Sequence, residues 1–429
     1  PKFAWVWEKP KPITVEEQPT SAGPASEIAE AVADLPDFLG PDRSGMWPAP
    51  AFGTDWHSHP PKLLWRRAIG KGWSSFAVSG TRAFTQEQIG DDEHITCLDL
   101  ATGATVWTHS DPQTRLLLER AENGGAAMGG DGPRATPVLF QNRVYTMGST
   151  GIANCLAQES GEKIWSRHLL RELGTIAHRW GMANSPLVLP EENLVVFAGP
   201  DEPGSTLVAC DPLSGETRWV HEGGGASYSS PRLVELLGTR QIVSVNQRDV
   251  SGIDPATGRR FWTHPWPGNW PKVAQPLLID GDRLLVTASY GMGSLLLQIS
   301  QAGKDGEWQV EQLWKSAQLK TKFSSPVVAG GYAYGLDEGR LACIDLATGK
   351  RIWKNEKFGF GQNLLFGTAL LVQTEPGDLV VGTVGPERFV EIGRIPALSS
   401  MTWNVPAVAG RILLARNDRE ASAWLLPAP

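Results

Sequence analysis

The sequence has little charge and no long apolar run. Charged residues make up 20% of the 429 residues, which is below the quarter usual in soluble domains. The formal net charge is −7, so the chain offers no broad basic surface that could displace phosphate counterions. We therefore expect no nucleic-acid partner. No apolar stretch reaches the roughly 18 residues that a membrane helix needs, and we expect no transmembrane segment.

The motifs of common enzymes are also missing. Only four cysteines occur, and they form neither an adjacent pair nor a Cys-x-x-Cys pair. There is no phosphate-cradling glycine loop, nucleophile elbow or zinc-binding helix motif, which disfavours hydrolases and nucleotide-dependent enzymes. His57 and His59 stand two positions apart, but this spacing is common and two prolines follow it. We predict no metal site and assign no catalytic residue.

Turn residues and tryptophan are abundant, with 47 Gly, 32 Pro and 18 Trp. This composition is typical of many short strands joined by tight turns. Within it the pattern Asp-x-x-Thr/Ser-Gly-x-x-x-Trp recurs, and the Trp always follows the Gly by four positions. Its copies, of which the second has Ala in place of Asp, are Asp99–Trp107, Ala157–Trp165, Asp211–Trp219, Asp254–Trp262 and Asp345–Trp353. The recurrence predicts one structural unit for each copy.

Each copy of the pattern has the chemistry of a hairpin. The Asp carboxylate can accept hydrogen bonds from backbone N–H groups of the turn, and the Gly supplies the positive φ that closes it. The next strand carries the Trp inward, where it is large enough to fill the gap between neighbouring sheets. We therefore predict a structural role for these tryptophans. The histidines two positions after a motif Trp are predicted to lie on the surface: His109, His221 and His264.

The spacing of the tryptophans predicts the architecture. Those at 107, 165, 219, 262, 314 and 353 are separated by 58, 54, 43, 52 and 39 residues, which suits one four-stranded blade each. Strand openings, most of them polar residues followed by Pro, number eight. Leu63–Arg67 resembles the outer strand that the last unit lacks, and pairing it there would close the ring. We predict an all-β protein, an eight-bladed β-propeller of four-stranded antiparallel blades closed by an N-terminal strand and monomeric.

This propeller is expected to span residues 61–429. Residues 1–60 are rich in Pro, Glu and Ala, and we predict an extended N-terminal arm that packs on the outside of the propeller or stays partly loose. Cys97, Cys155 and Cys343 hold equivalent positions in different blades. Such positions lie far apart, so we expect no disulfides and buried, apolar cysteines.

The repeated pattern resembles that of the pyrroloquinoline quinone (PQQ) propeller family. This family includes quinoprotein alcohol dehydrogenases and a non-enzymatic bacterial lipoprotein that assists outer-membrane protein assembly. Phe38–Gly45, before the first blade, looks like the opening motif of a group of exported bacterial propellers. The resemblance covers roughly residues 38 to 428, and it implies the fold and a periplasmic or otherwise exported location. We expect a leader to have been removed before Pro1. It leaves function open, since one fold hosts many functions.

Candidate ligand-binding residues come from two regions that meet at one mouth of a propeller channel. Residues at the strand openings are Trp73, Arg134, Asn184, Tyr228, Gln275, Lys322, Trp403 and Asn404. Residues of the long connections between blades are His178, Arg179, Trp180, Trp266, Asn269 and Trp270, and such connections are commonly functional. The connection at 111–134 is a further candidate. Alternatively, the polar residues cap the strand starts and the tryptophans only hold the connections down.

Two functions from different classes fit these observations. The first is a non-catalytic binding or scaffold propeller that recognises a protein or glycan partner through its funnel face and needs no cofactor. The second, implied by the resemblance, is a PQQ-dependent alcohol or sugar dehydrogenase with calcium and the quinone in the funnel. Against the second, the chain lacks the adjacent cysteines usual in those dehydrogenases, and no calcium-ligand set can be matched. A third reading is a propeller that binds a glycan or cleaves one with a carboxylate pair.

Overall fold

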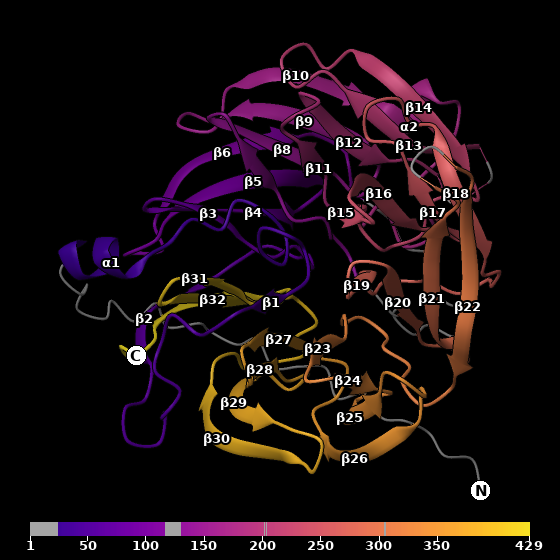
Figure 1. Cartoon of the computed structure of the whole chain (residues 1–429). Helices are drawn as coiled ribbons and strands as arrows, with labels where there is room; N and C mark the ends of the chain where they lie inside the picture. The colour runs from indigo at the N-terminus through magenta and orange to yellow at the C-terminus, as the bar shows by residue number, and fades with distance from the viewer. Residues whose placement is uncertain (1–24, 116–129, 201, 203, 304–305) are drawn as a thin grey trace, which may run out of the picture.

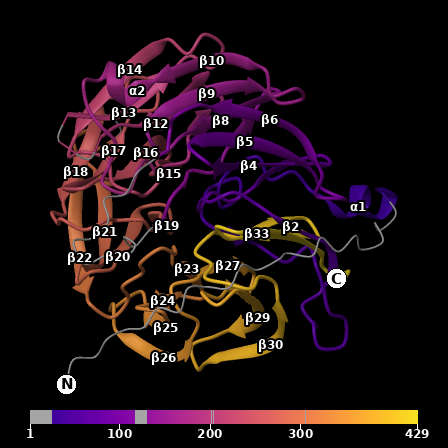
Figure 2. The same ribbon diagram turned by 180° about the vertical axis from the view of Figure 1, so that it is seen from behind.

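A computed structural model describes residues 25–115, 130–200, 202, 204–303 and 306–429 of the chain. Eight four-stranded blades form a ring around a central channel (Figures 1 and 2). The predicted eight-bladed propeller is therefore confirmed. Among the described residues, helix is confined to α1 (Ala25–Ala31) and α2 (Leu169–Glu172). Neither is long and apolar enough to cross a membrane.

Consecutive strands build each of the first seven blades. Blade one contains β3 (Ala77–Ser79), β4 (Arg82–Ile89), β5 (Asp92–Asp99) and β6 (Thr105–Asp111). Blade two contains β7 (Val138–Phe140), β8 (Arg143–Met147), β9 (Ile152–Ala157) and β10 (Lys163–His168). Blade three contains β11 (Leu187–Leu189), β12 (Leu194–Ala198), β13 (Gly204–Cys210) and β14 (Thr217–Gly223). Blade four contains β15 (Arg232–Leu236), β16 (Thr239–Val245), β17 (Asp249–Ile253) and β18 (Arg260–Pro265). Blade five contains β19 (Leu277–Ile279), β20 (Arg283–Ala288), β21 (Gly293–Gln301) and β22 (Trp308–Ser316). Blade six contains β23 (Val327–Ala329), β24 (Tyr332–Asp337), β25 (Arg340–Asp345) and β26 (Arg351–Lys357). Blade seven contains β27 (Gln362–Phe366), β28 (Ala369–Gln373), β29 (Asp378–Val384) and β30 (Phe389–Pro396).

The eighth blade joins the two ends of the chain. Its inner strands are β31 (Ala407–Ala409), β32 (Ile412–Arg416) and β33 (Glu420–Leu425), and its outermost strand is β2 (Lys62–Ala68). The β2 strand runs antiparallel to β33, with Trp65 opposite Ala423. The predicted closure is therefore confirmed, and it covers the sheet edge that β33 would otherwise expose.

A bulge marks the outermost strand of all eight blades at one equivalent position. The register shifts at the residue before the motif Trp, as at Val106 and Ile164, and before Gly393 in the seventh blade. An extra residue bends the strand and increases its twist, which makes an edge a poor template for pairing with another chain.

The motif tryptophans fill the gaps between blades, as predicted. The Trp165 indole N–H donates to Pro212 O in the next blade at 3.1 Å. The motif glycine of that blade, Gly215, lies against the Trp165 ring, so that an added Cβ would stand 2.8 Å from Cδ2. The same contact joins Gly161 to Trp107. The motif glycine is thus needed for its positive φ and for the approach of a neighbouring ring.

Other predictions about single residues had mixed outcomes. All four cysteines are free and buried, as predicted. His221 is buried rather than on the surface, with Nδ1 2.8 Å from Gly258 O. Residues two apart in a strand share a face, so the residue two positions after an inward Trp also faces the neighbouring blade.

We call residues 37–47 the channel segment. The arm was expected to pack on the outside of the propeller or to stay partly loose, but this part of it does not lie on the outside of the ring. Pro36 O accepts a hydrogen bond from Leu139 N at 2.9 Å on the innermost strand of blade two. From there the segment crosses to blade seven, where β1 (Met46–Trp47) pairs in parallel with the innermost strand, β27 (Figure 1). The segment therefore occupies the central channel.

Arg43 anchors the channel segment. Its side chain is almost completely buried and contacts the Asp37 carboxylate at 2.7 and 3.0 Å. The guanidinium also donates to Pro231 O at 2.9 Å and to Ser185 O at 3.3 Å, which lie just before the innermost strands of blades four and three. Ser185 and Pro231 lie 142 and 188 residues from Arg43 along the chain. No local sequence pattern therefore predicts these contacts.

Candidate functional site

The polar residues that open the innermost strands connect neighbouring blades. The hydroxyl groups of Thr136, Ser185 and Ser230 each accept a backbone N–H of the preceding blade at 2.9–3.1 Å. Asn184 and Asn404 act similarly, since each Nδ2 donates to two backbone carbonyls of the next blade. These side chains cap strand starts, which was the alternative reading of the sequence.

A cavity of about 170 Å³ opens between these strand starts. Half of the predicted ligand-binding residues line it: Trp73, Arg134, Trp180, Tyr228, Trp270, Gln275 and Trp403. Phe38, Tyr290 and Phe323, which were not among the predicted ligand-binding residues, complete an apolar and mostly aromatic wall.

The aromatic rings of this wall pack on one another in pairs. Trp403 lies 4.9 Å from Trp73 and 4.7 Å from Phe323 between ring centroids. Trp270 and Tyr290 stack at 4.9 Å with 14° between their planes. Each ring therefore limits the rotamers of its neighbour, and the cavity is preformed rather than made by a ligand.

The remaining predicted residues stand behind the wall or at its rim. The buried His178 packs edge-on against Tyr228 at 5.1 Å, and its Nε2 lies 3.2 Å from Gly199 O. Arg179 lies over the Trp180 ring at 5.1 Å. Trp266 is buried and faces the Lys272 ammonium at 5.5 Å. Asn269, on the same connection as Trp266, is exposed and does not line the cavity.

Two cations lie at the wall. Arg134 lines the cavity and donates to Gly132 O and Gly130 O at 2.7 and 2.8 Å. Burial lowers the pKa of Arg134 to about 10, so the guanidinium stays charged at neutral pH. Lys322, the last of the predicted residues, sits among three rings, with Nζ 4.1 Å from the Phe360 centroid and 5.2 Å from Phe323. Burial also lowers the pKa of Lys322.

The floor of the cavity is made by Phe38 and Leu39 of the channel segment. Leu39 has φ +62°, in the left-handed region that a branched apolar residue seldom adopts. The Phe38–Gly45 motif was visible in the sequence, but its place below the funnel depends on contacts with distant blades.

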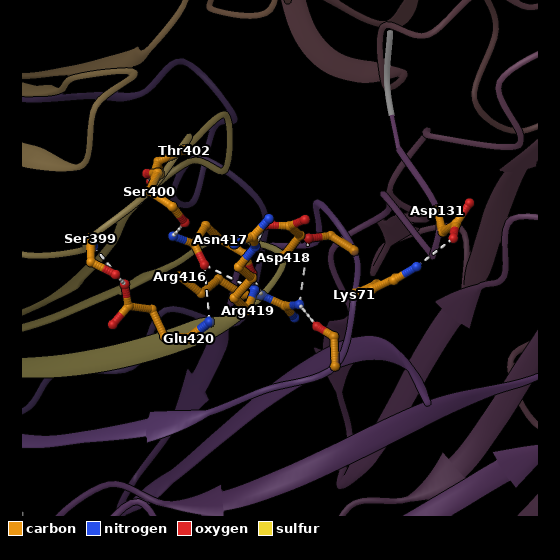
Figure 3. A network of polar contacts seen from close by, with 12 residues as sticks. Lys71, Asp131, Ser399, Ser400, Thr402, Arg416, Asn417, Asp418, Arg419 and Glu420 are labelled. Atoms are coloured by element: carbon orange, nitrogen blue, oxygen red, sulfur yellow. Dashed lines mark hydrogen bonds and ion pairs between the residues drawn. The ribbon is translucent and has the colours of Figure 1, made fainter. Parts of the chain in front are cut away.

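A polar network holds the rim where blades eight and one meet (Figure 3). Asn417, in the hairpin between β32 and β33, accepts the backbone N–H groups of Arg419 and Glu420 and donates to Ser400 Oγ, each at 2.9 Å. On the blade-one side, Lys71 pairs with Asp131 at 2.6 Å. The rest of the connection that begins at residue 111 lies partly outside the described residues, at 116–129.

The described lining does not fit a calcium-held quinone. Calcium takes six to eight oxygen ligands, among which protein carboxylates are prominent. No carboxylate lies among the described lining residues. Over the described part of the chain, no group of three or more His, Cys, Asp or Glu side chains is arranged to hold a metal ion.

Comparison with known proteins places the repeat in a family. The family model described as "Outer membrane protein assembly factor BamB" matches residues 91–355. Two curated proteins of that name match as well: that of Moranella endobia is 24% identical over 57% of this chain, and that of Alteromonas naphthalenivorans is 25% identical over 54%. The aligned regions span 63% and 57% of those two relatives.

Solved structures agree on the fold. BamB from Moraxella catarrhalis superposes with a TM-score of 0.58 at 13% identity, covering 85% of this chain and all of that one. A quinohemoprotein alcohol dehydrogenase from Comamonas testosteroni superposes with a TM-score of 0.65 at 12% identity, covering 95% of this chain and 84% of that one. Since the family model matches more than half of the residues, the chain belongs to the PQQ-type β-propeller family that includes the BamB proteins.

Proposed function

We propose that this chain is a non-catalytic binding propeller that holds a protein partner at its funnel face. The observation that carries the proposal is the aromatic cavity, which opens between the strand starts and has no carboxylate among its described lining residues. A site of this kind can bind apolar groups, and its described lining offers no carboxylate or histidine as a general acid or base.

Apolar side chains on the surrounding rim support a protein partner. Ile89, Ile176, Trp270 and Met401 are 55%, 82%, 48% and 44% exposed. They belong to hairpins and connections at the mouth where the innermost strands start. Exposed aliphatic and aromatic groups around a pocket are typical of the centre of a protein interface. A glycan would require more hydrogen-bonding groups than this wall provides, so a protein partner is favoured.

The relatives supply the biological context. Proteins with the name outer membrane protein assembly factor share the repeat, so we propose a role in handling other proteins and a periplasmic or otherwise exported location. We further propose that residues 61–429 act as one monomeric propeller and residues 1–60 as an N-terminal arm. Part of that arm, the channel segment, closes the channel.

The alternative function, a PQQ-dependent alcohol or sugar dehydrogenase, is supported by the shared fold alone. The described lining does not fit a quinone held by calcium, and we propose no cofactor. No catalytic step is therefore assigned to this funnel.

Site-specific photo-crosslinking tests the binding role. A benzoylphenylalanine at position 270, on the funnel rim, should give a discrete adduct with a partner in cells of the source organism. The same group at Leu213 is the matched control, because Leu213 is also exposed, at 53%, but lies in a hairpin at the opposite face. Adducts at position 213 and none at 270 would overturn the proposed funnel face.

A further inference from the structure

A second concave surface lies on the face of the ring opposite the funnel. It is a groove of about 880 Å³ between blades four and five, within the roughly 300–1,000 Å³ of known ligand sites. It is lined by residues of three hairpins: 237–239 between β15 and β16, 259–261 between β17 and β18, and 301, 303 and 306–308 between β21 and β22. We call it the hairpin groove.

One wall of the hairpin groove is an extension of blade five. Its outermost strand, β22, begins six residues before Trp314, whereas β18 of blade four begins two residues before Trp262. At about 3.3 Å per residue, the extension carries the β21–β22 hairpin over blade four, where β22 contacts β18 (Figure 1). Trp308, the first residue of β22, packs on Phe261 of β18 with 5.7 Å between the ring centroids. The groove therefore forms where blade five departs from the repeat.

Two adjacent arginines stand at the other wall of the hairpin groove. Arg259 and Arg260 follow the motif glycine of blade four and are exposed. Arg259 lies over the Phe261 ring at 5.9 Å. Within the described residues, neither guanidinium has an ion pair or a hydrogen bond with the rest of the chain.

An arginine at the equivalent position of blade six has a structural role instead. Arg351, like Arg260, comes two residues after the motif glycine. Its guanidinium donates to the Asp337 carboxylate at 3.0 Å and to Gln318 O at 2.9 Å. The fold can thus use this position for a contact between blades, and in blade four it does not.

Two carboxylates belong to the same hairpins, and they leave the groove with an excess of positive charge. Asp254 accepts hydrogen bonds from Ala256 N at 2.9 Å and from Thr257 Oγ1 at 2.7 Å, within its own turn. Glu307 lines the groove and offsets one of the two arginine charges. The described lining is therefore positive, although the chain as a whole has a net charge of −7.

The composition of the hairpin groove is typical of a protein-binding site. Arginine, tryptophan and phenylalanine are enriched at the centres of protein interfaces, and Leu237 adds an apolar side chain that is 48% exposed. A partner carboxylate can pair with either guanidinium. An apolar side chain of the partner can pack on the rings of Phe261 and Trp308.

We propose that the hairpin groove binds an acidic segment of a protein partner, with carboxylates at Arg259 and Arg260 and an apolar side chain on the rings of Phe261 and Trp308. This is a second binding site, on the opposite face from the funnel. The two proposals fail separately, since crosslinking at position 270 reports on the funnel rim and peptide binding that depends on Arg260 reports on the hairpin groove.

Fluorescence anisotropy with matched peptides tests the partner chemistry on the full chain at physiological ionic strength. The probe is a dye-labelled hexapeptide of alternating Asp and Phe, and we expect saturable binding. A peptide of alternating Lys and Phe and one of alternating Asp and Ser should each bind at least about tenfold more weakly, because each lacks one of the two features that the groove recognises. Equal binding of the three peptides, or no binding of the first, would overturn the proposal. Binding of anionic phosphatidylglycerol vesicles without binding of the peptide would also contradict it.

Substitutions locate the bound peptide. Arg260→Glu should weaken binding of the Asp and Phe peptide at least about tenfold. Lys163→Glu is the matched control: Lys163 is exposed, stands two residues after the motif glycine of blade two, and undergoes the same change of charge. It should alter the affinity less than about twofold. Trp308→Ala keeps both arginines and should also weaken binding, and thermal unfolding checks that each variant is folded. Equal weakening by Arg260→Glu and Lys163→Glu would show that net charge and not the groove determines binding, and it would overturn the proposal.

Discussion

At the scale of residues, the most constrained position of each repeat is the motif glycine. It has a positive φ, and its neighbour in the preceding blade is a tryptophan ring rather than open space. Four of the five motif tryptophans in turn donate their indole N–H across the same gap, and Trp65 of the closing strand does the same to Leu100 O at 2.8 Å. Trp262 donates instead to Gln241 Oε1 of its own blade at 2.7 Å. The pattern Gly-x-x-x-Trp is therefore required by the contacts between blades as well as by the turn within one blade.

A matched pair of glycines separates these two requirements. Gly215 and Gly238 both have φ +75°, but an added Cβ meets Trp165 at 2.8 Å in the first and nothing within 4 Å in the second. We expect Gly238→Ala to lower the free energy of unfolding by about 1 kcal/mol and Gly215→Ala by about 2–4 kcal/mol. Urea unfolding measures both. Equal losses of unfolding free energy would mean that the close contact with the Trp165 ring adds nothing to the cost of Gly215→Ala.

Glu93 links stability to pH. It is 3% exposed and accepts hydrogen bonds from Ser149 N at 3.0 and 3.2 Å. Burial, with a smaller contribution from the nearby Asp111 carboxylate, raises the pKa of Glu93 from its ordinary value of 4.5 to about 7. The folded state therefore holds this proton more tightly than the unfolded state, so the contribution of Glu93 to stability is fully present below pH 4.5 and is lost as the pH rises through 7.

We predict that Glu93→Gln removes this pH dependence. Between pH 4.5 and 8 the unsubstituted protein should lose about 3 kcal/mol of unfolding free energy relative to the variant. Glu159→Gln, in an exposed turn, is the control. Parallel pH profiles of the Glu93 variant and the unsubstituted protein would contradict the assignment.

At the scale of elements, the blades were predictable and the channel segment was not. Turn chemistry and the Trp period are local signals, and they gave the strands, the hairpins and the closing strand. Arg43 binds carbonyls of two blades far along the chain, and a short motif contains no information about such partners. We therefore placed this stretch on the outside of the ring.

The candidate site was predictable to the same extent. The strand openings converge where expected, but the direction of each side chain could not be derived. Trp73 and Tyr228 face the cavity, whereas Asn184 and Asn404 turn to the neighbouring blade. The choice depends on which backbone carbonyls the adjacent blade presents, and this is a property of the assembled ring.

Arg43→Met tests the anchoring of the channel segment. The substitution leaves the Asp37 carboxylate buried without its guanidinium, and we expect a loss of about 3–5 kcal/mol in unfolding free energy. Burial already raises the pKa of Asp37 even with Arg43 beside it. The double variant Asp37→Asn, Arg43→Met should recover part of the loss. An Arg43→Met protein as stable as the unsubstituted one would show that the segment is not anchored in the channel.

At the scale of the whole molecule, the ring depends on one strand from the beginning of the chain. The β2 strand completes blade eight, and its Trp65 is 4% exposed between blades eight and one. An indole–carbonyl hydrogen bond of this kind then crosses six of the eight gaps between blades, and the outermost strands all have the bulge that discourages pairing with another chain.

Trp65→Ala should therefore destabilise the ring as strongly as Trp165→Ala, which sits between two internal blades and makes the same indole–carbonyl hydrogen bond. We expect a loss of about 3–5 kcal/mol for each, since both leave a cavity. Thermal and urea unfolding measure the two variants side by side. A much smaller loss for Trp65 would mean that the closing strand contributes little to the ring.

The central claim is that the funnel binds a partner and performs no quinone chemistry. Titration of the purified protein with PQQ and calcium, followed by absorbance, thermal shift and dye-linked oxidation of primary alcohols and sugars, tests it most directly. The account predicts no saturable rise in melting temperature and no turnover at high micromolar quinone. A saturable rise together with alcohol or sugar oxidation would contradict it and establish a dehydrogenase.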